Sequence, residues 1–484
     1  MVKANPPAKY ISLSLITMLC GILLCGCGSP SPSIPPEGGS IPFTSPTETG
    51  STPSPFLPQP TGTPTTPQIG GTREDIGGWI HLRISGSPYE RGFQHGYLLG
   101  EEIMENIKIQ DYSLKHDTGQ DFSFFREEAV QFYGEMVDPE YQAEMKGIAD
   151  GARAQGVEVS YEDIFCLNAL IDLTSWWRIK VQGSASQLNH CSAFIATGDW
   201  TADGKIIIAH NTWWDYFSFS PWNLILDITP EEGYHIVMQS APGLIWSGSD
   251  FFLTGAGLMG CETTIYNFQR FREEGTPAFL RSRRAMQYAD SLEDFVNLLN
   301  EGNNGGYPNS WLLGDVRTGE IARFEQGLEY ISFEKKSNGY FAGYNAAEDP
   351  DIQSECGGWS ADDPSNFSGA RKARFEELMA EYKGRIDVEI AKIILADHYD
   401  TWLGKENPSS RTICGHYVYH EAPSGAMDGK VTTSDLASGM HLWAFWGAPC
   451  GIPFVAEEAI EENPQFQWLK GYLKDLPAGS WSLF

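Results

Sequence analysis

Basic residues are scarce in this sequence relative to acidic ones. Its 484 residues hold 33 Lys and Arg against 63 Asp and Glu, which gives a formal net charge of −30 at pH 7. A chain this acidic repels the phosphates of nucleic acids and the anionic headgroups of lipids. We therefore expect neither nucleic acid as a partner nor electrostatic adhesion to a membrane surface.

Three common signatures of hydrolases and metal sites are also missing. The absence of G-x-S-x-G disfavours a serine hydrolase, and the absence of H-E-x-x-H disfavours a zinc hydrolase. The nine cysteines include no C-x-x-C pair, so their spacing matches no zinc pattern, and we expect neither a metal nor a cofactor. Cys356, Cys414 and Cys450 lie in Gly-rich, loop-like contexts and are the best disulfide candidates.

The start of the chain has the proportions of a secretory signal. Two lysines precede an apolar run over residues 10–24, about 15 residues long, which is too short for a comfortable membrane span. The run closes on Leu24-Cys25-Gly26-Cys27, which resembles the lipobox of prokaryotic lipoproteins. This resemblance implies a signal peptide over 1–26 and lipidation of Cys27. An ordinary cleaved signal or an uncleaved anchor is the alternative.

A Pro-, Ser- and Thr-rich segment separates this start from the body of the chain. Residues 28–71 contain 12 of the 29 prolines and almost no charge, so they cannot bury enough apolar surface to fold. We expect 27–71 to be a disordered tether and 72–484 to be one domain, because no second linker or internal repeat interrupts the body. The arrangement predicts an extracytoplasmic protein that its lipid anchors to the cell membrane.

The pattern of the body changes from helical to strand-like near residue 191. Alternation predicts a first strand over 79–85, and Ser160 and Asp163 predict an N-terminal cap for one of the helices that follow. The expected helices are 89–107, 124–136, 139–155, 161–173, 278–289, 292–299, 368–382 and 388–396. The expected strands are 191–197, 205–211, 223–228, 235–239, 251–265, 311–314 and 320–326, with 412–446 mostly strand. This order predicts an α+β protein with helical layers flanking its sheets.

The most informative stretch is the hairpin that begins at Cys191. Asp203-Gly204, a strong turn signal, separates the two strands and predicts that they pair. Pairing would bring Cys191 to the same sheet edge as His210 and the polar residues that follow it, up to Asp215. A thiol with such partners indicates nucleophilic catalysis, although a cysteine that opens a strand is more often a small buried hydrophobe.

From this point the body resembles the cysteine N-terminal nucleophile hydrolases, in particular the group related to acyl-coenzyme A:6-aminopenicillanic acid acyltransferase and to phospholipase B-like proteins. The resemblance rests on the order of several landmarks: YERGFQHG at 89, CSAF at 191, HNTWWDY at 210, NSWLLGD at 309, ARKAR at 370 and GAPC at 447. It implies a four-layer αββα sandwich. It also implies self-cleavage between His190 and Cys191, into chains 72–190 and 191–484.

The implied cleavage would give Cys191 a free α-amine. Such an amine has a pKa of roughly 7.7 to 8, so it can accept the thiol proton of its own residue near neutral pH. One residue then serves as nucleophile and base. The thiolate would attack the acyl carbon of a small acylated substrate, and water or an amine would resolve the acyl-enzyme.

The resemblance assigns supporting roles by position. Asn309 matches the asparagine that helps to form the oxyanion hole, and Arg371 matches an arginine near the nucleophile, where a cation favours thiolate. Asp215 fits the acid that orients the α-amine in the acyltransferase pattern, whereas His210 fits the phospholipase B-like position. The sequence carries both His210 and Asp215, and it has two more residues between Asn211 and Asp215 than the acyltransferase pattern. The choice between His210 and Asp215 therefore stays open.

The leading hypothesis is therefore a lipid-anchored, self-processing amidase or acyltransferase that acts on an acyl amide. The alternative within enzymes is a phospholipase B-like acyl-ester hydrolase. A noncatalytic binding lipoprotein on the same fold is the alternative of another class, and the presence of Cys191, Asn309 and Arg371 speaks against it. The sequence predicts no oligomeric state.

Overall fold

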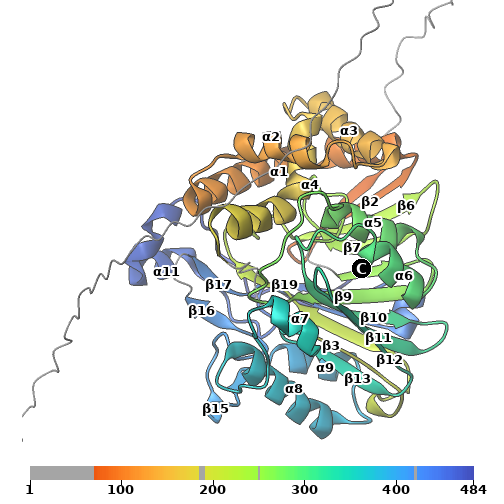
Figure 1. Cartoon of the computed structure of the whole chain (residues 1–484), viewed down its shortest axis with the longest axis vertical. Helices are drawn as coiled ribbons and strands as arrows, with labels where there is room; N and C mark the ends of the chain where they lie inside the picture. The colour runs from red at the N-terminus through yellow and green to blue at the C-terminus, as the bar shows by residue number, and fades with distance from the viewer. Residues whose placement is uncertain (1–69, 185–190, 249–250, 419–421) are drawn as a thin grey trace, which may run out of the picture. The chain divides into compact units, whose positions relative to one another are not determined.

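The computed structural model describes residues 70–184, 191–248, 251–418 and 422–484 (Figure 1). The expected signal peptide, the lipidation site Cys27, residues 27–69 of the expected tether, and His190 lie outside the described residues. Within the described part, no helix is both long enough and apolar enough to cross a membrane.

The larger of the two main sheets has nine strands. Strands β2 and β6 pair in parallel, and the other neighbours in this sheet are antiparallel. In spatial order the strands are β1 (Thr72–Ile76), β2 (Trp79–Gly86), β6 (Leu224–Pro230), β7 (Ile236–Ser240), β8 (Phe251–Thr254), β9 (Leu258–Thr264), β10 (Asn309–Asp315), β11 (Glu320–Gln326) and β12 (Ile331–Lys336).

The second main sheet is antiparallel and contains the expected hairpin. Its strands β3 and β4 pair with Ser192 opposite Asn211, so the Asp-Gly turn does join two neighbouring strands. In spatial order the six strands are β13 (Gly339–Gly343), β3 (Ser192–Thr197), β4 (Ile207–Asn211), β18 (Asp428–Thr433), β19 (Trp443–Trp446) and β20 (Ser482–Leu483). Smaller sheets join β16 (His416–Val418), β17 (Pro423–Ala426) and β5 (Trp213–Asp215), and β14 (Tyr399–Asp400) and β15 (Lys405–Glu406).

Most of the helices cover the outer faces of the two main sheets. Helices α5 and α6 lie against the nine-stranded sheet, α8 lies beside β13, and α9 lies beside β4 and β18 (Figure 1). The α-helices are α1 (Pro88–Thr118), α2 (Phe122–Tyr133), α3 (Pro139–Ala154), α4 (Tyr161–Trp176), α5 (Ala278–Tyr288), α6 (Leu292–Asn300), α7 (Pro350–Glu355), α8 (Phe367–Tyr382), α9 (Val388–Leu395), α10 (Ser434–Ser438) and α11 (Ala456–Glu462).

Alternate residues of the strands enter different hydrophobic cores, because successive side chains of a strand point to opposite faces. Leu226 packs with helices α1 to α6, whereas its neighbour Ile225 packs with Ile195 and Ile208 of the six-stranded sheet. Phe194, on the other face of that sheet, packs with residues of α8 and α9. The two sheets therefore face each other across a core of their own, and the expected α+β class is confirmed.

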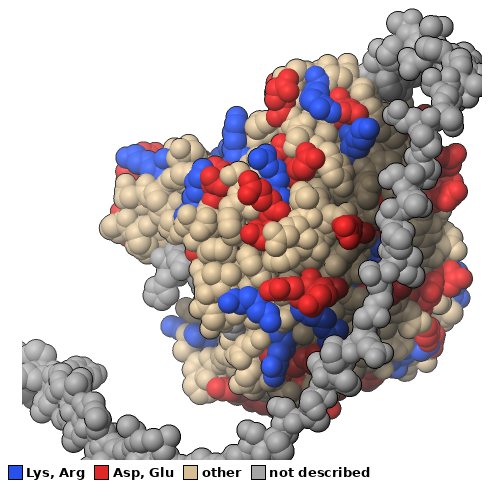
Figure 2. Space-filling view, turned by 45° about the horizontal axis from the view of Figure 1, so that its top comes forward, with Lys and Arg blue, Asp and Glu red and all other residues tan. Residues whose placement is uncertain are grey.

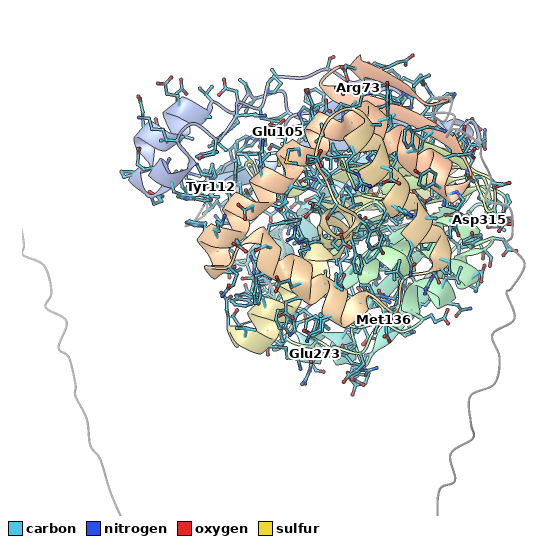
Figure 3. The ribbon with its side chains drawn as sticks, turned by 90° about the horizontal axis from the view of Figure 1, so that it is seen from above. Arg73, Glu105, Tyr112, Met136, Glu273 and Asp315 are labelled. Atoms are coloured by element: carbon cyan, nitrogen blue, oxygen red, sulfur yellow. The ribbon has the colours of Figure 1, made fainter. Side chains whose placement is uncertain are left out.

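Helices α1 and α3 pack with their backbones in contact. A Cβ atom on Gly92 would lie 1.9 Å from the carbonyl oxygen of Glu144, and one on Gly96 would lie 1.8 Å from that of Ile148. No side chain fits at either position, which gives the YERGFQHG landmark a structural reason. Near the other end of α1, Tyr112 stacks on Tyr472 at 4.3 Å, where the C-terminal helical segment meets α1 (Figure 3).

One expected strand is in fact two. The range 251–265 contains β8 and β9, and a turn at residues 255–257 separates them. Gly257 has a φ of 84°, a conformation that favours glycine, and its N–H donates to the carbonyl of Thr254 at 2.9 Å. The prediction of one continuous strand was wrong because the Gly-Ala-Gly turn was overlooked.

Charged side chains of both signs share the surface. On the face shown in Figure 2, Lys and Arg side chains lie among Asp and Glu side chains. Ion pairs join many described residues, for example Arg284 and Asp138 at 2.7 Å and Arg126 and Asp163 at 2.8 Å.

Candidate functional site

Cys191 directly precedes β3 and is almost fully buried, with 4% of its surface exposed. Because side chains alternate along the strand, Cys191 shares its face with Ala193 and Ile195, which belong to the core between the two sheets. Burial raises the pKa of the thiol well above its ordinary value, and the charge of Glu262 raises it further. The backbone N–H of Trp213 and the ammonium of Lys430 act in the opposite direction.

His210 lies on the same face of the neighbouring strand. It is the register partner of Ala193 on β3 and of Lys430 on β18, and it is fully buried. Neither ring nitrogen makes a hydrogen bond of ordinary geometry with the described residues, although the Glu262 backbone is close enough to raise the pKa of the ring. Burial is the larger effect and, reinforced by the charge of Lys430, lowers the pKa of His210 well below its ordinary value, so the ring is neutral. The structure thus brings the expected Cys191 and His210 to adjacent strands and to one face.

A buried ion pair lies beside them. Lys430 Nζ is 2.7 Å from Asp428 Oδ1 and donates to Thr212 Oγ1 at 2.7 Å, and it also donates to Gln239 Oε1. The other carboxylate oxygen of Asp428 accepts a hydrogen bond from Gln239 Nε2 at 2.7 Å. Burial of charged groups costs free energy unless they are paired, and such groups are common at functional sites.

The pair of Asp428 and Lys430 was not predicted from the sequence. Asp428 and Lys430 are two positions apart in a strand, which is the spacing that puts two side chains on one face. That signal was present in the sequence. Their proximity to His210 depends on the pairing of β18 with β4, which no local pattern specifies.

Asn309 opens β10 of the nine-stranded sheet and is bound to Glu262. With its amide assigned from its neighbours, Asn309 Nδ2 donates to Glu262 Oε2 at 2.7 Å and to the carbonyl of Pro308 at 2.8 Å. Tyr307 Oη donates to the other oxygen of Glu262 at 2.8 Å. Asn309 shares its face with Trp311, which packs toward the helices. Its partner Glu262 carries the charge that raises the pKa of the Cys191 thiol.

Arg371 approaches Cys191 from the opposite face of the sheet. Its Nη1 donates to the carbonyl of Cys191 at 2.6 Å and to Ser192 Oγ at 3.1 Å. Its Nη2 donates to the carbonyl of Tyr344 at 3.0 Å and to Asn345 Oδ1 at 2.8 Å. The fully buried guanidinium of Arg371, a residue of α8, thus holds the backbone of Cys191 in place by its hydrogen bond to the Cys191 carbonyl.

Asp215 lies beyond the end of β4, in a different sheet. It belongs to β5, where its register partner is Ser424 of β17. Its Oδ1 accepts hydrogen bonds from the N–H groups of Phe217 at 3.1 Å and Ser218 at 2.7 Å, and Ser218 Oγ donates to its Oδ2. Burial raises the pKa of this carboxyl. Its hydrogen bonds with described residues therefore support the turn at 216–218.

An aromatic cavity of about 130 Å³ adjoins this turn. Asp215 and Trp214 line it together with side chains of α1 and α4. Trp222, another lining residue, accepts a hydrogen bond on its carbonyl from Gln239 Nε2 at 3.0 Å. Gln239 binds both Asp428 and Lys430, so it links the backbone of one lining residue of the cavity to the buried ion pair.

A comparison with models of protein families indicates which class of proteins this chain is similar to. The family model described as Phospholipase B matches residues 104–331, a range that includes Cys191, His210, Asp215 and Asn309 and ends before Arg371.

Individual relatives point the same way. The chain is 30% identical over 254 residues to an uncharacterized protein of Archaeoglobus fulgidus, which covers 50% of this chain and 42% of that protein. It is 26% identical over 296 residues to a phospholipase B of Crotalus adamanteus, covering 55% and 53%, and 22% identical over 426 residues to phospholipase B-like 1 of Bos taurus, covering 74% and 75%. The chain thus spans about half the length of the first two relatives. Its relationship to phospholipase B-like proteins, which the landmarks predicted, is confirmed.

Proposed function

We propose that this protein is a hydrolase of the phospholipase B type that cleaves an acyl ester through an acyl-enzyme on Cys191. The relationship to phospholipase B-like proteins supports the reaction class. One observation carries the assignment of the site: the buried thiol of Cys191 and the buried imidazole of His210 share a face of adjacent strands, beside the buried pair of Lys430 and Asp428.

We propose that the thiol becomes active only after the chain cuts itself before Cys191. In the uncut chain burial raises the thiol pKa, which keeps the sulfur protonated. Attack of the thiol on the preceding carbonyl would convert the peptide bond into a thioester and release the α-amine of Cys191. Hydrolysis of that thioester by water would then leave Cys191 with a free thiol and an amine whose pKa lies near 8.

The supporting groups have separate tasks in this proposal. The α-amine removes the thiol proton, and the Trp213 N–H and the Lys430 ammonium stabilise the thiolate. His210, neutral and on the strand next to Cys191, would accept a hydrogen bond from the amine, and the place of Asp215 in a different sheet favours His210 for this task. Arg371 holds the Cys191 carbonyl, and therefore the strand end, in one orientation.

The apolar part of the lining of the cavity beside the turn at 216–218 supports a role in binding the acyl part of the substrate. Trp214, Trp222, Trp246 and Leu244 give it apolar walls, and apolar chains are bound by burial of their surface. We propose that an acyl chain occupies it while the ester carbon lies at Cys191.

We also keep three finer assignments as proposals. The two facing sheets between helical layers agree with the four-layer αββα sandwich of the N-terminal nucleophile hydrolases. The amidase or acyltransferase activity that the sequence favoured has no counterpart in the names of the relatives, so ester cleavage comes first. Lipidation of Cys27 would hold the enzyme at the outer side of the cell membrane, and membrane fractions of Cys27→Ser would then lose it.

The test is a matched panel of substrates. Esters and amides that carry the same acyl chain, phospholipids among them, are incubated with the wild type, with Cys191→Ala and with Cys166→Ala, a control that replaces another buried thiol. We expect ester hydrolysis by the wild type and by Cys166→Ala and none by Cys191→Ala. Amide cleavage without ester cleavage would favour the amidase, and full activity of Cys191→Ala would disprove the assignment of the nucleophile.

A further inference from the structure

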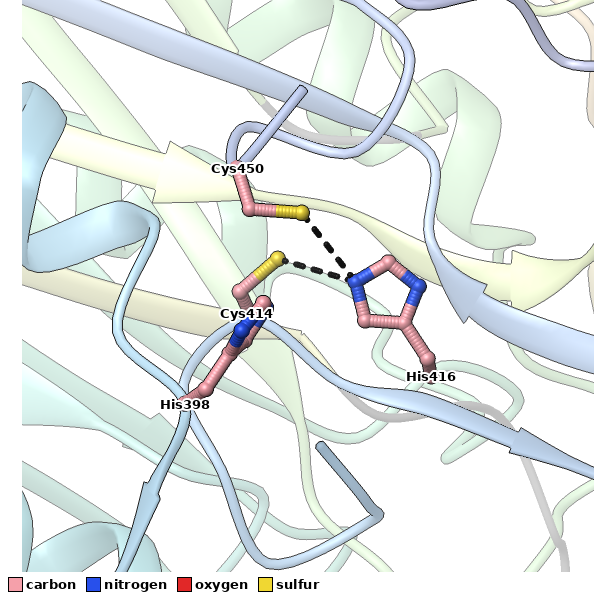
Figure 4. A group of neighbouring side chains, drawn as sticks. All are labelled: His398, Cys414, His416 and Cys450. Carbon is pink, nitrogen blue, oxygen red and sulfur yellow. Dashed lines mark hydrogen bonds between the residues drawn. The ribbon is translucent and has the colours of Figure 1, made fainter. Parts of the chain in front are cut away.

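Two imidazoles and two thiols meet at one point outside the region described so far (Figure 4). His398 precedes β14, Cys414 and His416 lie before and at the start of β16, and Cys450 follows β19. One donor atom from each residue lies within 4.8 Å of the corresponding atoms of the other three. Three segments that are far apart in the sequence therefore place four metal-binding side chains together.

The distances fit a tetrahedral ion better than they fit hydrogen bonds alone. His416 Nε2 lies 3.6 Å from Cys414 Sγ and 3.3 Å from Cys450 Sγ. A tetrahedral zinc ion with Zn–S of about 2.3 Å and Zn–N of about 2.0 to 2.1 Å separates its sulfur and nitrogen ligands by roughly 3.5 Å. The imidazole nitrogen already stands at this separation from both sulfurs.

The surroundings leave the cluster with an incomplete set of partners. The Nε2 atom of His398 is buried and has no hydrogen-bond partner among the described residues. Cys414 is fully buried and packs with Trp213, Ala426 and Ala448, so it lies in an apolar environment. Buried polar atoms normally have partners, and a bound cation would supply one to all four donors at once.

The donor set selects the kind of ion. Thiolates and imidazoles suit zinc, whereas calcium and magnesium prefer oxygen ligands, and none of the four residues offers a carboxylate. We propose that His398, Cys414, His416 and Cys450 bind a zinc ion. Four protein ligands fill a tetrahedral shell, so the site is closed and structural, without an open position for substrate.

The site would brace the end of strand β4. The carbonyl of Ile413, which precedes Cys414, accepts hydrogen bonds from Asn211 Nδ2 at 3.0 Å and from Trp213 Nε1 at 3.1 Å. Asn211 and Trp213 belong to the segment that directly follows His210 in the sequence. Zinc would thus fix the loop against the strand end that carries His210. This inference does not depend on the proposed hydrolase activity.

The spacing of the four residues explains why the sequence predicted no metal. Cys414 and His416 are two apart, but His398 and Cys450 come from distant loops, so no C-x-x-C or H-x-x-x-H pattern arises. Cys414 and Cys450, which the sequence marked as disulfide candidates, do lie together. Cys356 does not join them, because it packs with Ile265 and Phe268, and its Sγ donates to the carbonyl of Ile352 at 3.4 Å.

Metal analysis of the full chain tests the proposal directly. The protein is prepared with zinc in the medium and without chelator, and elemental mass spectrometry should find one zinc per chain. Cys450→Ser and His398→Ala should each lower this content at least tenfold, whereas Cys356→Ser, the matched control, should retain it. Exchange with Co²⁺ should give the visible absorption of tetrahedral cobalt bound by thiolates. Zinc content of the wild type near zero would overturn the proposal.

Thiol counting separates the zinc site from a disulfide. Unfolding in a chelating buffer without reductant should free both Cys414 and Cys450, so the wild type should have two more reactive thiols than Cys414→Ser/Cys450→Ser. Equal counts would mean that the two sulfurs are bonded to each other, which would overturn the zinc site. Because this measurement uses unfolded protein, it remains decisive even if a ligand variant folds poorly.

Discussion

Lys430 Nζ and Asp428 Oδ1 lie 2.7 Å apart, and neither side chain is exposed to solvent. Both residues belong to β18, and Lys430 is the register partner of His210. Desolvation of two charges costs several kcal/mol per ion, and mutual attraction often only balances this cost. We propose that this pair acts on Cys191, since the charge of Lys430 lowers the pKa of the thiol and that of Asp428 raises it.

Removal of one partner of this pair should be severe. Lys430→Met leaves the Asp428 carboxylate buried without its cation, and we expect a loss of about 3 to 5 kcal/mol in the free energy of unfolding. Urea denaturation measures it. Lys205→Met, which removes the exposed partner of Asp435, should cost less than about 1 kcal/mol. If Lys430→Met unfolds at the wild-type urea concentration, the pair is not buried as described.

Arg371 should matter through its geometry and not only through its charge. Arg371→Lys keeps the cation but loses the planar fork that reaches five acceptors. One charge-assisted hydrogen bond contributes about 1.5 to 3 kcal/mol, so self-cleavage before Cys191 should slow by roughly tenfold or more. A time course of chain cleavage measures the rate. Arg374→Lys, a change in the same helix as Arg371, alters the ion pair with Asp397 and should leave the cleavage rate unchanged. Cleavage of Arg371→Lys at the wild-type rate would contradict the positioning role of Arg371.

His210 should make the protein sensitive to acid. Burial lowers the folded-state pKa of His210 below its unfolded value of about 6.5, so only the unfolded state gains a proton as the pH falls below that value. Because His210 is neutral in the folded state, the free energy of unfolding falls as the pH drops below about 6.5, by up to roughly 1.4 kcal/mol per pH unit.

His210→Gln should remove this part of the dependence of the unfolding free energy on pH, measured by urea denaturation between pH 7.5 and 5. His95 provides a comparison, because burial lowers its pKa to about 3, and His95→Gln should reduce the slope by a similar amount. An unchanged slope for His210→Gln would mean that the ring gains its proton over the same pH range in the folded and in the unfolded protein, which would contradict its lowered pKa.

The aromatic cavity should set the preference for acyl chain length. Ile171 of α4 lines it and is only partly buried, so Ile171→Trp should narrow the cavity without disruption of the core. We expect hydrolysis of long-chain esters to fall at least about tenfold relative to short-chain esters, since each buried methylene contributes about 0.8 kcal/mol. Ile393→Trp, at an exposed position, should leave the ratio as it is. An equal loss for short and long chains would place the acyl group elsewhere.

Local signals predicted the elements, and pairing between distant strands determined the site. The Asp-Gly turn predicted that β3 and β4 are neighbours, and Ser160 does cap α4, since its side chain accepts a hydrogen bond from the Asp163 N–H at 3.1 Å. These features depend on residues that are close in the chain. Lys430 reaches His210 only because β18 pairs with β4, and hydrophobic alternation is the same for any partner strand.

The same limit applied to the cysteines and to Asp215. The sequence placed Cys414 and Cys450 in similar loops, but only the folded chain brings His398 and His416 to them. Asp215 follows β4 closely, yet the segment between them leaves the six-stranded sheet to pair with β17. Distance along the sequence was therefore a poor guide to distance in space at both sites.

The central claim is that Cys191 becomes an N-terminal nucleophile. Intact-mass spectrometry with N-terminal sequencing of the purified full chain tests it most directly. The account predicts two fragments for the wild type and for Cys166→Ala, the second beginning at Cys191, and one uncut chain for Cys191→Ala. A wild type that stays uncut while it hydrolyses acyl esters would contradict the account.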